Sequence, residues 1–155
     1  MLHSELTEKI EFEINEIETL IKSYSSLVEL CKNQEPDLIY LSALATMLHS
    51  FYNGLENIFL SISKTIDKQI PQASNWHKIL LYKMGEKTEN KNPVLSEETI
   101  EKLEEYLSFR HFFRHSYSYH LSWNKLKPLV SELSELWLKI KEEIIKFKSN
   151  IKNVS

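Results

Sequence analysis

Apolar residues recur at steps of three and four along most of the chain, which is the spacing of amphipathic helices rather than of strands. Polar or proline-containing breaks separate the apolar stripes, and helices usually begin and end at such breaks. The stripes predict five helices, over residues 6–31, about 37–67, 76–84, a stretch that begins after Ser96 and a stretch that begins near residues 124–128. We therefore expect an all-α fold, an up-and-down bundle of four long helices and one short helix.

The composition agrees with this class of fold. The 155 residues are 42% hydrophobic and 26% charged, which suits one globular core, so we expect a single domain over residues 1–155. Two glycines and four prolines are too few for the many tight turns of a β-rich fold.

One uncharged segment has to be distinguished from a membrane span. Residues 38–55 contain no Asp, Glu, Lys or Arg, but they include Ser42, His49 and Asn53. This polarity favours a central bundle helix with a thin polar seam over a helix in lipid, so we expect no membrane association. The lone Cys31, together with an acidic start that lacks the pattern of a signal peptide, favours a cytoplasmic protein.

Basic residues gather in one part of the chain. Between Tyr106 and Ser131 there is no Asp or Glu, although the whole chain has a net charge of -3. The cationic or titratable side chains of this stretch are Arg110, His111, Arg114, His115, His120, Lys125 and Lys127. A local positive segment of this kind indicates phosphate binding.

Helical geometry separates the best candidates in this segment. On an ideal helix Arg110 and Arg114 share a face, and Tyr117 returns to within about 20° of Arg110. His115 lies roughly 140° away from Arg110. Arg110 and His115 can therefore act on one substrate only if the helix ends near Ser116 or if a second subunit completes the site. This requirement favours a symmetric homodimer with clefts along the fourth helices.

The order of these residues resembles a known motif. Arg110, four further residues, His115, one residue and Tyr117 reproduce the R-x4-H-x-Y pattern of HEPN domains, and most closely that of HepT-like ribonuclease toxins. The polar His111 fits the position after the arginine. The runs LHSFYNGLENIF at residues 48–59 and WHKILL at residues 76–81 are similar to the second and third helices of that family.

The resemblance implies a HEPN-like fold and a metal-independent endoribonuclease that needs no cofactor. Such a protein is the toxin of a two-protein module, with RNA as substrate and a minimal nucleotidyltransferase as antitoxin. The motif implies that Arg110 and His115 are catalytic and that His111 is an orienting or auxiliary group. Arg114, from the same cationic segment, is a further auxiliary or RNA-binding candidate. The motif also implies that adenylylation (AMPylation) of Tyr117 silences the toxin.

Several alternative interpretations of the same residues remain. Arg110 and Arg114 could pair with glutamates of the first helix. Arg114 and His120 fit a competing R-x5-H frame, and His111 and His115 have the spacing of a zinc pair.

Other neighbouring side chains have structural interpretations. The aromatic residues around the motif are interpreted as core or dimer packing, with base stacking as the alternative for Tyr119. They are Tyr106, Phe109, Phe112, Phe113 and Tyr119. His49 and Glu56 lie seven residues apart on one helix face and are interpreted as a structural polar contact.

Two other classes of function stay open at this point. One is a non-catalytic HEPN binding module that docks a nucleotidyltransferase and holds nucleotide or phosphate. The other is an interaction protein whose bundle serves as a dimer scaffold. A scaffold has no need for Arg, His and Tyr in this register, so the sequence favours the endoribonuclease.

Overall fold

The structure is a computed structural model that describes residues 2–154, and within this range it contains helices and no strands. Its elements are α1 (Leu2–Ser23), α2 (Ser25–Cys31), α3 (Leu38–Ile62), the π-helical turn η1 (Ser63–Asp67), α4 (Trp76–Lys83), α5 (Glu97–His115), the 3-10 turn η2 (Ser118–His120) and α6 (Trp123–Val154). The predicted all-α, HEPN-like bundle is therefore confirmed.

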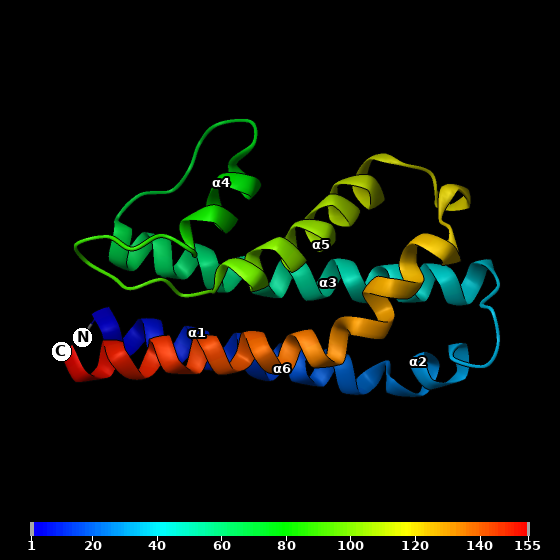
Figure 1. The fold of residues 1–155 in the computed structure, drawn as a ribbon, viewed down its shortest axis with the longest axis horizontal. Helices are drawn as coiled ribbons and strands as arrows, with labels where there is room; N and C mark the ends of the chain where they lie inside the picture. The colour runs from blue at the N-terminus through cyan, green and yellow to red at the C-terminus, as the bar shows by residue number, and fades with distance from the viewer. Residues whose placement is uncertain (1, 155) are drawn as a thin grey trace.

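Helix α3 is the centre of the bundle, because it packs against α1, α4, α5 and α6. Helices α1, α3 and α6 run along the long axis of the molecule, and α5 crosses α3 obliquely (Figure 1). Both ends of the described chain lie at one end of this long axis (Figure 1). The connection from α5 to α6 lies toward the opposite end.

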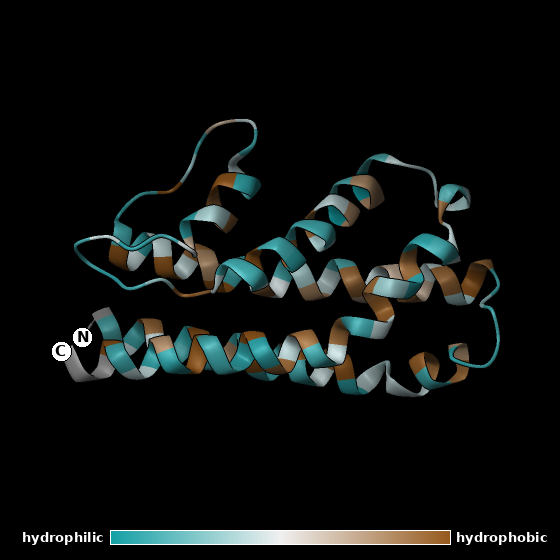
Figure 2. Cartoon of the chain, in the orientation of Figure 1, coloured by the Kyte–Doolittle hydropathy of each residue, from teal (hydrophilic) through white to brown (hydrophobic). Residues whose placement is uncertain are grey.

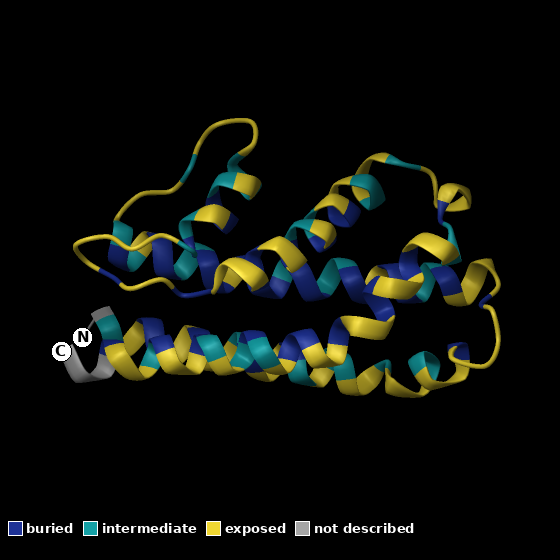
Figure 3. Cartoon of the chain, viewed as in Figure 1, coloured by how far each residue is buried: buried dark blue, intermediate teal, exposed yellow. Residues whose placement is uncertain are grey.

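The apolar stripes predicted from the sequence form the core. Residues 38–55, which we distinguished from a membrane span, carry fully buried side chains such as Leu44, Phe51 and Leu55. Each side chain of this size contributes about 1.5–3 kcal/mol when it leaves water. Apolar and buried positions coincide along the inward faces of the long helices, and polar residues cover their outer faces (Figures 2 and 3).

The first predicted helix is interrupted, so residues 6–31 do not form one continuous element. Helix α1 ends at Ser23, and Tyr24 leaves helical geometry with φ −98° and ψ 1°. The hydroxyl of Ser23 donates to the carbonyl of Thr19, and the hydroxyl of Ser25 donates to the carbonyl of Lys22. Serine hydroxyls that bond to the backbone compete with the helical ladder, which accounts for the break.

The predicted start of the fourth helix is confirmed. Ser96 caps α5 by accepting a hydrogen bond from the backbone N–H of Thr99 at 3.2 Å. The two carboxylate oxygens of Glu143 on α6 accept from the backbone N–H of Ser96 and from the hydroxyl of Thr99, both at 2.6 Å. This cap stabilises the start of α5 and attaches it to α6.

The last helix begins at Trp123, slightly before the predicted residues 124–128, and contains Pro128. Proline lacks the N–H that would bond one turn back, and the early part of α6 bends in Figure 1. Tyr106 of α5 donates its hydroxyl to the carbonyl of Leu129 at 2.6 Å, which ties the two helices together near this bend.

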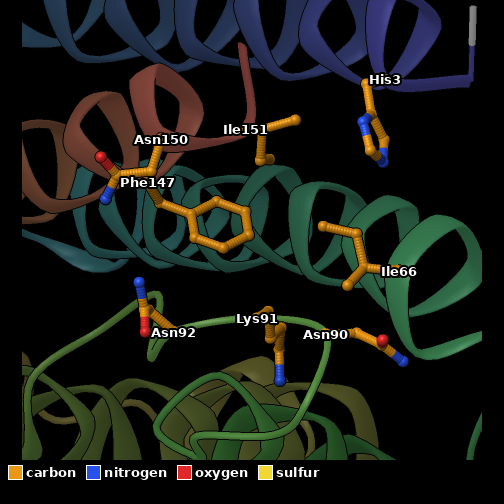
Figure 4. Close-up of a pocket in the computed structure, with 8 residues that line it drawn as sticks. All are labelled: His3, Ile66, Asn90, Lys91, Asn92, Phe147, Asn150 and Ile151. Atoms are coloured by element: carbon orange, nitrogen blue, oxygen red, sulfur yellow. The ribbon is translucent and has the colours of Figure 1, made fainter. Parts of the chain in front are cut away.

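A buried lysine anchors the loop between α4 and α5 at the end of the bundle that holds the termini. The ammonium of Lys91 donates to the carbonyl of Lys83 at 3.1 Å and pairs with the carboxylate of Asp67 at 3.4 Å. Figure 4 shows Lys91 beside a cavity of about 110 Å³. The residues that line this cavity are His3, Ile66, Asn90, Lys91, Asn92, Phe147, Asn150 and Ile151. None of them belongs to the predicted site, so we assign this cavity no function.

Helices α1 and α3 approach each other closely at Gly54. A Cβ at position 54 would lie 2.8 Å from Cγ1 of Ile17 and 3.1 Å from its Cδ1. A contact shorter than 3 Å requires the Ile17 side chain or the helix backbone to shift, which costs about 1–3 kcal/mol in a packed core.

We expect Gly54→Ala to lower the free energy of unfolding by about 1–2 kcal/mol, although alanine has a helix propensity about 1 kcal/mol better than glycine. Urea denaturation followed by circular dichroism measures this change. In an Ile17→Ala background the same substitution should cost less, because the clashing carbon is gone. A Gly54→Ala protein as stable as the parent would contradict the close approach.

Candidate active site

The cationic segment lies where α5 ends and the chain turns toward α6. Helix α5 ends at His115, and Ser116 has an extended backbone with φ −120° and ψ 158°. The condition set by the sequence geometry, that the helix ends near Ser116, is therefore met. Tyr117 consequently does not share a helical face with Arg110, as an uninterrupted helix would require.

Arg110 is buried against α3, with 7% of its surface exposed. Its Nε donates to the side-chain oxygen of Asn53 at 3.1 Å, and its Nη2 lies 3.5 Å from Oε1 of Glu56. The alternative that Arg110 pairs with a glutamate of the first helix is therefore wrong, because the carboxylate comes from the central helix.

Glu56 holds three helices together. It is 4% exposed, and its second oxygen, Oε2, lies 2.7 Å from Nδ1 of His77 on α4. One buried carboxylate thus contacts a guanidinium from α5 and an imidazole from α4. A buried charge is tolerated only when it is paired and hydrogen-bonded, and both conditions hold here.

His49 extends this network on the other side of Asn53. Its Nδ1 lies 3.3 Å from the amide nitrogen of Asn53, and its ring packs 5.3 Å from that of Phe113. Burial above all, and then the positive charges of Arg110 and Arg114, lower the pKa of His49, which favours its neutral form. Its Nε2 is buried and has no hydrogen-bond partner within the described residues.

The predicted structural role of His49 and Glu56 is correct in kind but wrong in its pairing. Each contributes to a buried polar network, yet their contacts are with Asn53, with Arg110 and with His77. The sequence indicated the roles of His49 and Asn53 only because they are polar residues inside the uncharged segment 38–55. No sequence signal connects His77, which lies 21 residues beyond Glu56.

His115 is exposed, in contrast to Arg110. Its Nδ1 lies 2.8 Å from the backbone carbonyl of His111, and the two imidazole rings are 4.4 Å apart. A carbonyl only accepts, so Nδ1 carries the proton of the neutral ring and Nε2 is the atom that can take up a further proton. No contact joins Arg110 and His115 within the described chain, so one chain alone presents them separately.

The remaining candidates are at the surface. Arg114 and His111 are exposed on the last turns of α5. Tyr117 lies beyond the end of the helix with 72% of its surface exposed, and its ring stacks on that of Tyr119 at 5.6 Å with 6° between the planes. The hydroxyl of Tyr117 is thus accessible to a partner protein.

Two further features of the described residues bear on the site. Within residues 2–154 no three His, Cys, Asp or Glu side chains are grouped in a way that would hold a metal ion. None of the helices in this range combines the length and the apolar character that a membrane crossing requires.

A family model described as a HepT-like protein matches residues 43–151, a range that contains the whole of α4 and α5 and most of α3 and α6. The motif residues Arg110, His115 and Tyr117 lie inside it. Neither a curated protein nor a solved structure matches the chain.

The buried ion pair predicts a large effect on stability. Glu56→Ala leaves Arg110 buried without its carboxylate, so we expect the free energy of unfolding to fall by about 3–5 kcal/mol. Urea denaturation followed by circular dichroism measures this loss. The double variant Glu56→Ala/Arg110→Met should recover part of it, because no unpaired charge is left.

Glu132 supplies a matched control. Its carboxylate pairs with Lys102 at 3.6 Å, but both side chains are about half exposed, 47% and 48% respectively. Glu132→Ala should cost at most about 1 kcal/mol, as is usual for surface pairs. Equal costs for Glu56→Ala and Glu132→Ala would contradict the central role of Glu56.

Proposed function

The chain belongs to the HepT-like family of HEPN toxins, and on that premise we propose that it is a metal-independent endoribonuclease controlled by a minimal nucleotidyltransferase antitoxin. The observation that carries this proposal is the R-x4-H-x-Y motif at the end of α5, inside the matched range and inside a segment without Asp or Glu. Helix α5 ends at His115, which supports a site at the helix end.

His115 is suited to the proton transfers of RNA cleavage. In the proposed step its Nε2 takes the proton of a ribose 2′-hydroxyl, whose oxygen then forms a bond to the neighbouring phosphorus. The bond from phosphorus to the 5′ oxygen breaks, and that oxygen needs a proton. The His115 of a second subunit supplies it, so a symmetric homodimer divides the work of base and acid.

Arg110 is proposed to stabilise the charge on the pentavalent phosphorane. To do so its guanidinium has to exchange Glu56 for the phosphate of RNA. The carboxylate of Glu56 is then held by His77, whose Nδ1 is already 2.7 Å from its other oxygen. Asn53, which accepts from Nε of Arg110 at 3.1 Å, keeps the guanidinium oriented during this exchange.

Tyr117 is proposed as the residue through which the antitoxin acts. Its exposed hydroxyl supports modification by a nucleotidyltransferase. An AMP group on this hydroxyl would place a phosphate and a bulky base two residues from His115 and three residues from Arg114. Negative charge and bulk at that position would compete with RNA for the same cations.

A second candidate function is favoured by one specific observation. Arg110 is buried and neutralised by Glu56 in the single chain. If that pair does not open, the chain is a non-catalytic HEPN module that docks a nucleotidyltransferase and holds nucleotide or phosphate on its exposed cations.

Digestion of RNA in the presence of EDTA tests the main proposal. We expect cleavage by the parent protein that resists the chelator, and a loss of about 100-fold or more for His115→Ala, because a positioned proton-transfer group contributes a factor of that size. Arg110→Ala and Arg110→Lys should both lose activity, since lysine keeps the charge but not the planar, two-point grip on phosphate.

The controls separate folding from chemistry. His115 is exposed, so His115→Ala should keep the parent's circular dichroism and stability. His3→Ala, at the other end of the bundle, should keep full activity. Cleavage that survives both motif substitutions would refute the assignment and favour the binding module. Loss through His120→Ala rather than His115→Ala would favour the R-x5-H frame, and inhibition by EDTA would favour a zinc pair.

Incubation with the partner nucleotidyltransferase and ATP tests the proposed control. We expect the mass of the chain to rise by one AMP group and the RNA cleavage to stop. Tyr117→Phe should prevent the mass change, whereas the neighbouring Tyr119→Phe should not. Modification at another residue, or an unchanged mass, would contradict this mode of control.

A further inference from the structure

Two tyrosines form an exposed ring stack directly after the motif. Tyr117 and Tyr119 are 72% and 67% exposed, and their rings are nearly parallel, with centroids 5.6 Å apart. Both belong to the short connection between α5 and α6, which the turn η2 shapes. Large aromatic faces left in water at a folded surface indicate a partner that covers them.

The surroundings of the stack determine which partner fits. The chain around it has no Asp or Glu from residue 106 to residue 131. Within this stretch Arg114, His115, Lys125 and Lys127 are all exposed. Cations beside open aromatic faces are the combination with which proteins bind single-stranded nucleic acids, because phosphates meet the charges and bases stack on the rings.

We propose that Tyr117 and Tyr119 form a base-stacking platform for single-stranded RNA, an inference that rests on the proposed function and specifies its substrate. The ring of Tyr119 lies nearly parallel to that of Tyr117, so a base stacks on the face of Tyr117 that Tyr119 leaves open. Every base has a π face, so the platform accepts RNA with little regard to sequence. Paired bases are already stacked within a duplex, so the platform selects unpaired nucleotides.

The platform also fixes where the strand lies relative to the catalytic imidazole. Tyr117 follows His115 by two residues, immediately beyond the end of α5. A nucleotide stacked there brings its own phosphates to His115 and Arg114. Unpaired RNA is also the form in which the 2′-hydroxyl can align with the phosphorus for attack.

Binding of an RNA that cannot be cleaved tests the platform independently of catalysis. The probe is a fluorescent oligouridylate with 2′-O-methyl groups, which has no 2′-hydroxyl to attack phosphorus, and its anisotropy is measured at constant salt. We expect Tyr117→Ala to weaken binding about 10-fold, the effect of losing the ring on which a base stacks. Tyr119→Ala should weaken it less, because it removes only the ring that supports Tyr117. Tyr117→Phe and Tyr119→Phe should bind like the parent, because the ring stays.

Two controls make the comparison specific. Tyr82→Ala removes a partly exposed tyrosine of α4, away from the cationic segment, and should leave the affinity unchanged. An abasic strand with the same number of phosphates should bind the parent and both alanine variants equally, because it has nothing to stack. Binding of a duplex of the same length should be weaker than that of the single strand.

Each possible result either supports or overturns the base-stacking platform. Alanine variants that bind the single strand as tightly as the parent overturn the platform, and so does an abasic strand that binds the parent as well as the oligouridylate. Absence of any RNA binding overturns it too. A changed sedimentation coefficient in the alanine variants at unchanged RNA affinity would show that the rings meet a protein instead. Loss of affinity through the alanine variants in a protein that does not cleave RNA would support the platform and refute the ribonuclease.

Discussion

The buried carboxylate of Glu56 is the constraint on which the arrangement of the site depends. It is in contact with Arg110 of α5 and with His77 of α4, and it belongs to the central helix α3. A charge in this position is stable only with its partners, so the three helices cannot shift independently. Apolar packing specifies a bundle, whereas this ion pair specifies the rotation of α5 about its axis and therefore the direction in which the end of α5 points.

The same contact sets the conditions for activity under the proposed function. Arg110 is held in the protein interior by the carboxylate of Glu56. The guanidinium must therefore bind the phosphate of RNA more strongly than it binds Glu56. His77 lowers the cost of that exchange because the carboxylate it leaves behind still has a hydrogen-bond donor. An endoribonuclease built in this way would act only on RNA that is already bound, and the exposed residues Arg114, Tyr117 and Tyr119 provide binding that precedes the exchange.

Sequence periodicity predicted the helices because the apolar stripes of the long helices meet in one buried core. It failed at Tyr24, where hydroxyls of Ser23 and Ser25 bond to the backbone, because such local bonds do not alter the apolar spacing. For the site, the motif spacing required a helix end near Ser116, and the structure has one. The partners of Arg110 could not be predicted, since Asn53 and Glu56 of α3 reach it only through tertiary packing. The single-domain organisation and the catalytic roles stay predictions.

The structure divides the motif into a buried half and an exposed half. Arg110 is enclosed by the bundle, whereas His115 presents its Nε2 at the surface with its tautomer set by the carbonyl of His111. A helix that continued past Ser116 would have placed Tyr117 beside Arg110 and kept the imidazole on another face. Because α5 ends at His115, Tyr117 instead follows the direction of the connecting segment, whereas the imidazole stays on the last turn of the helix. A second subunit that approaches this end of the helix would bring a second imidazole to the same strand.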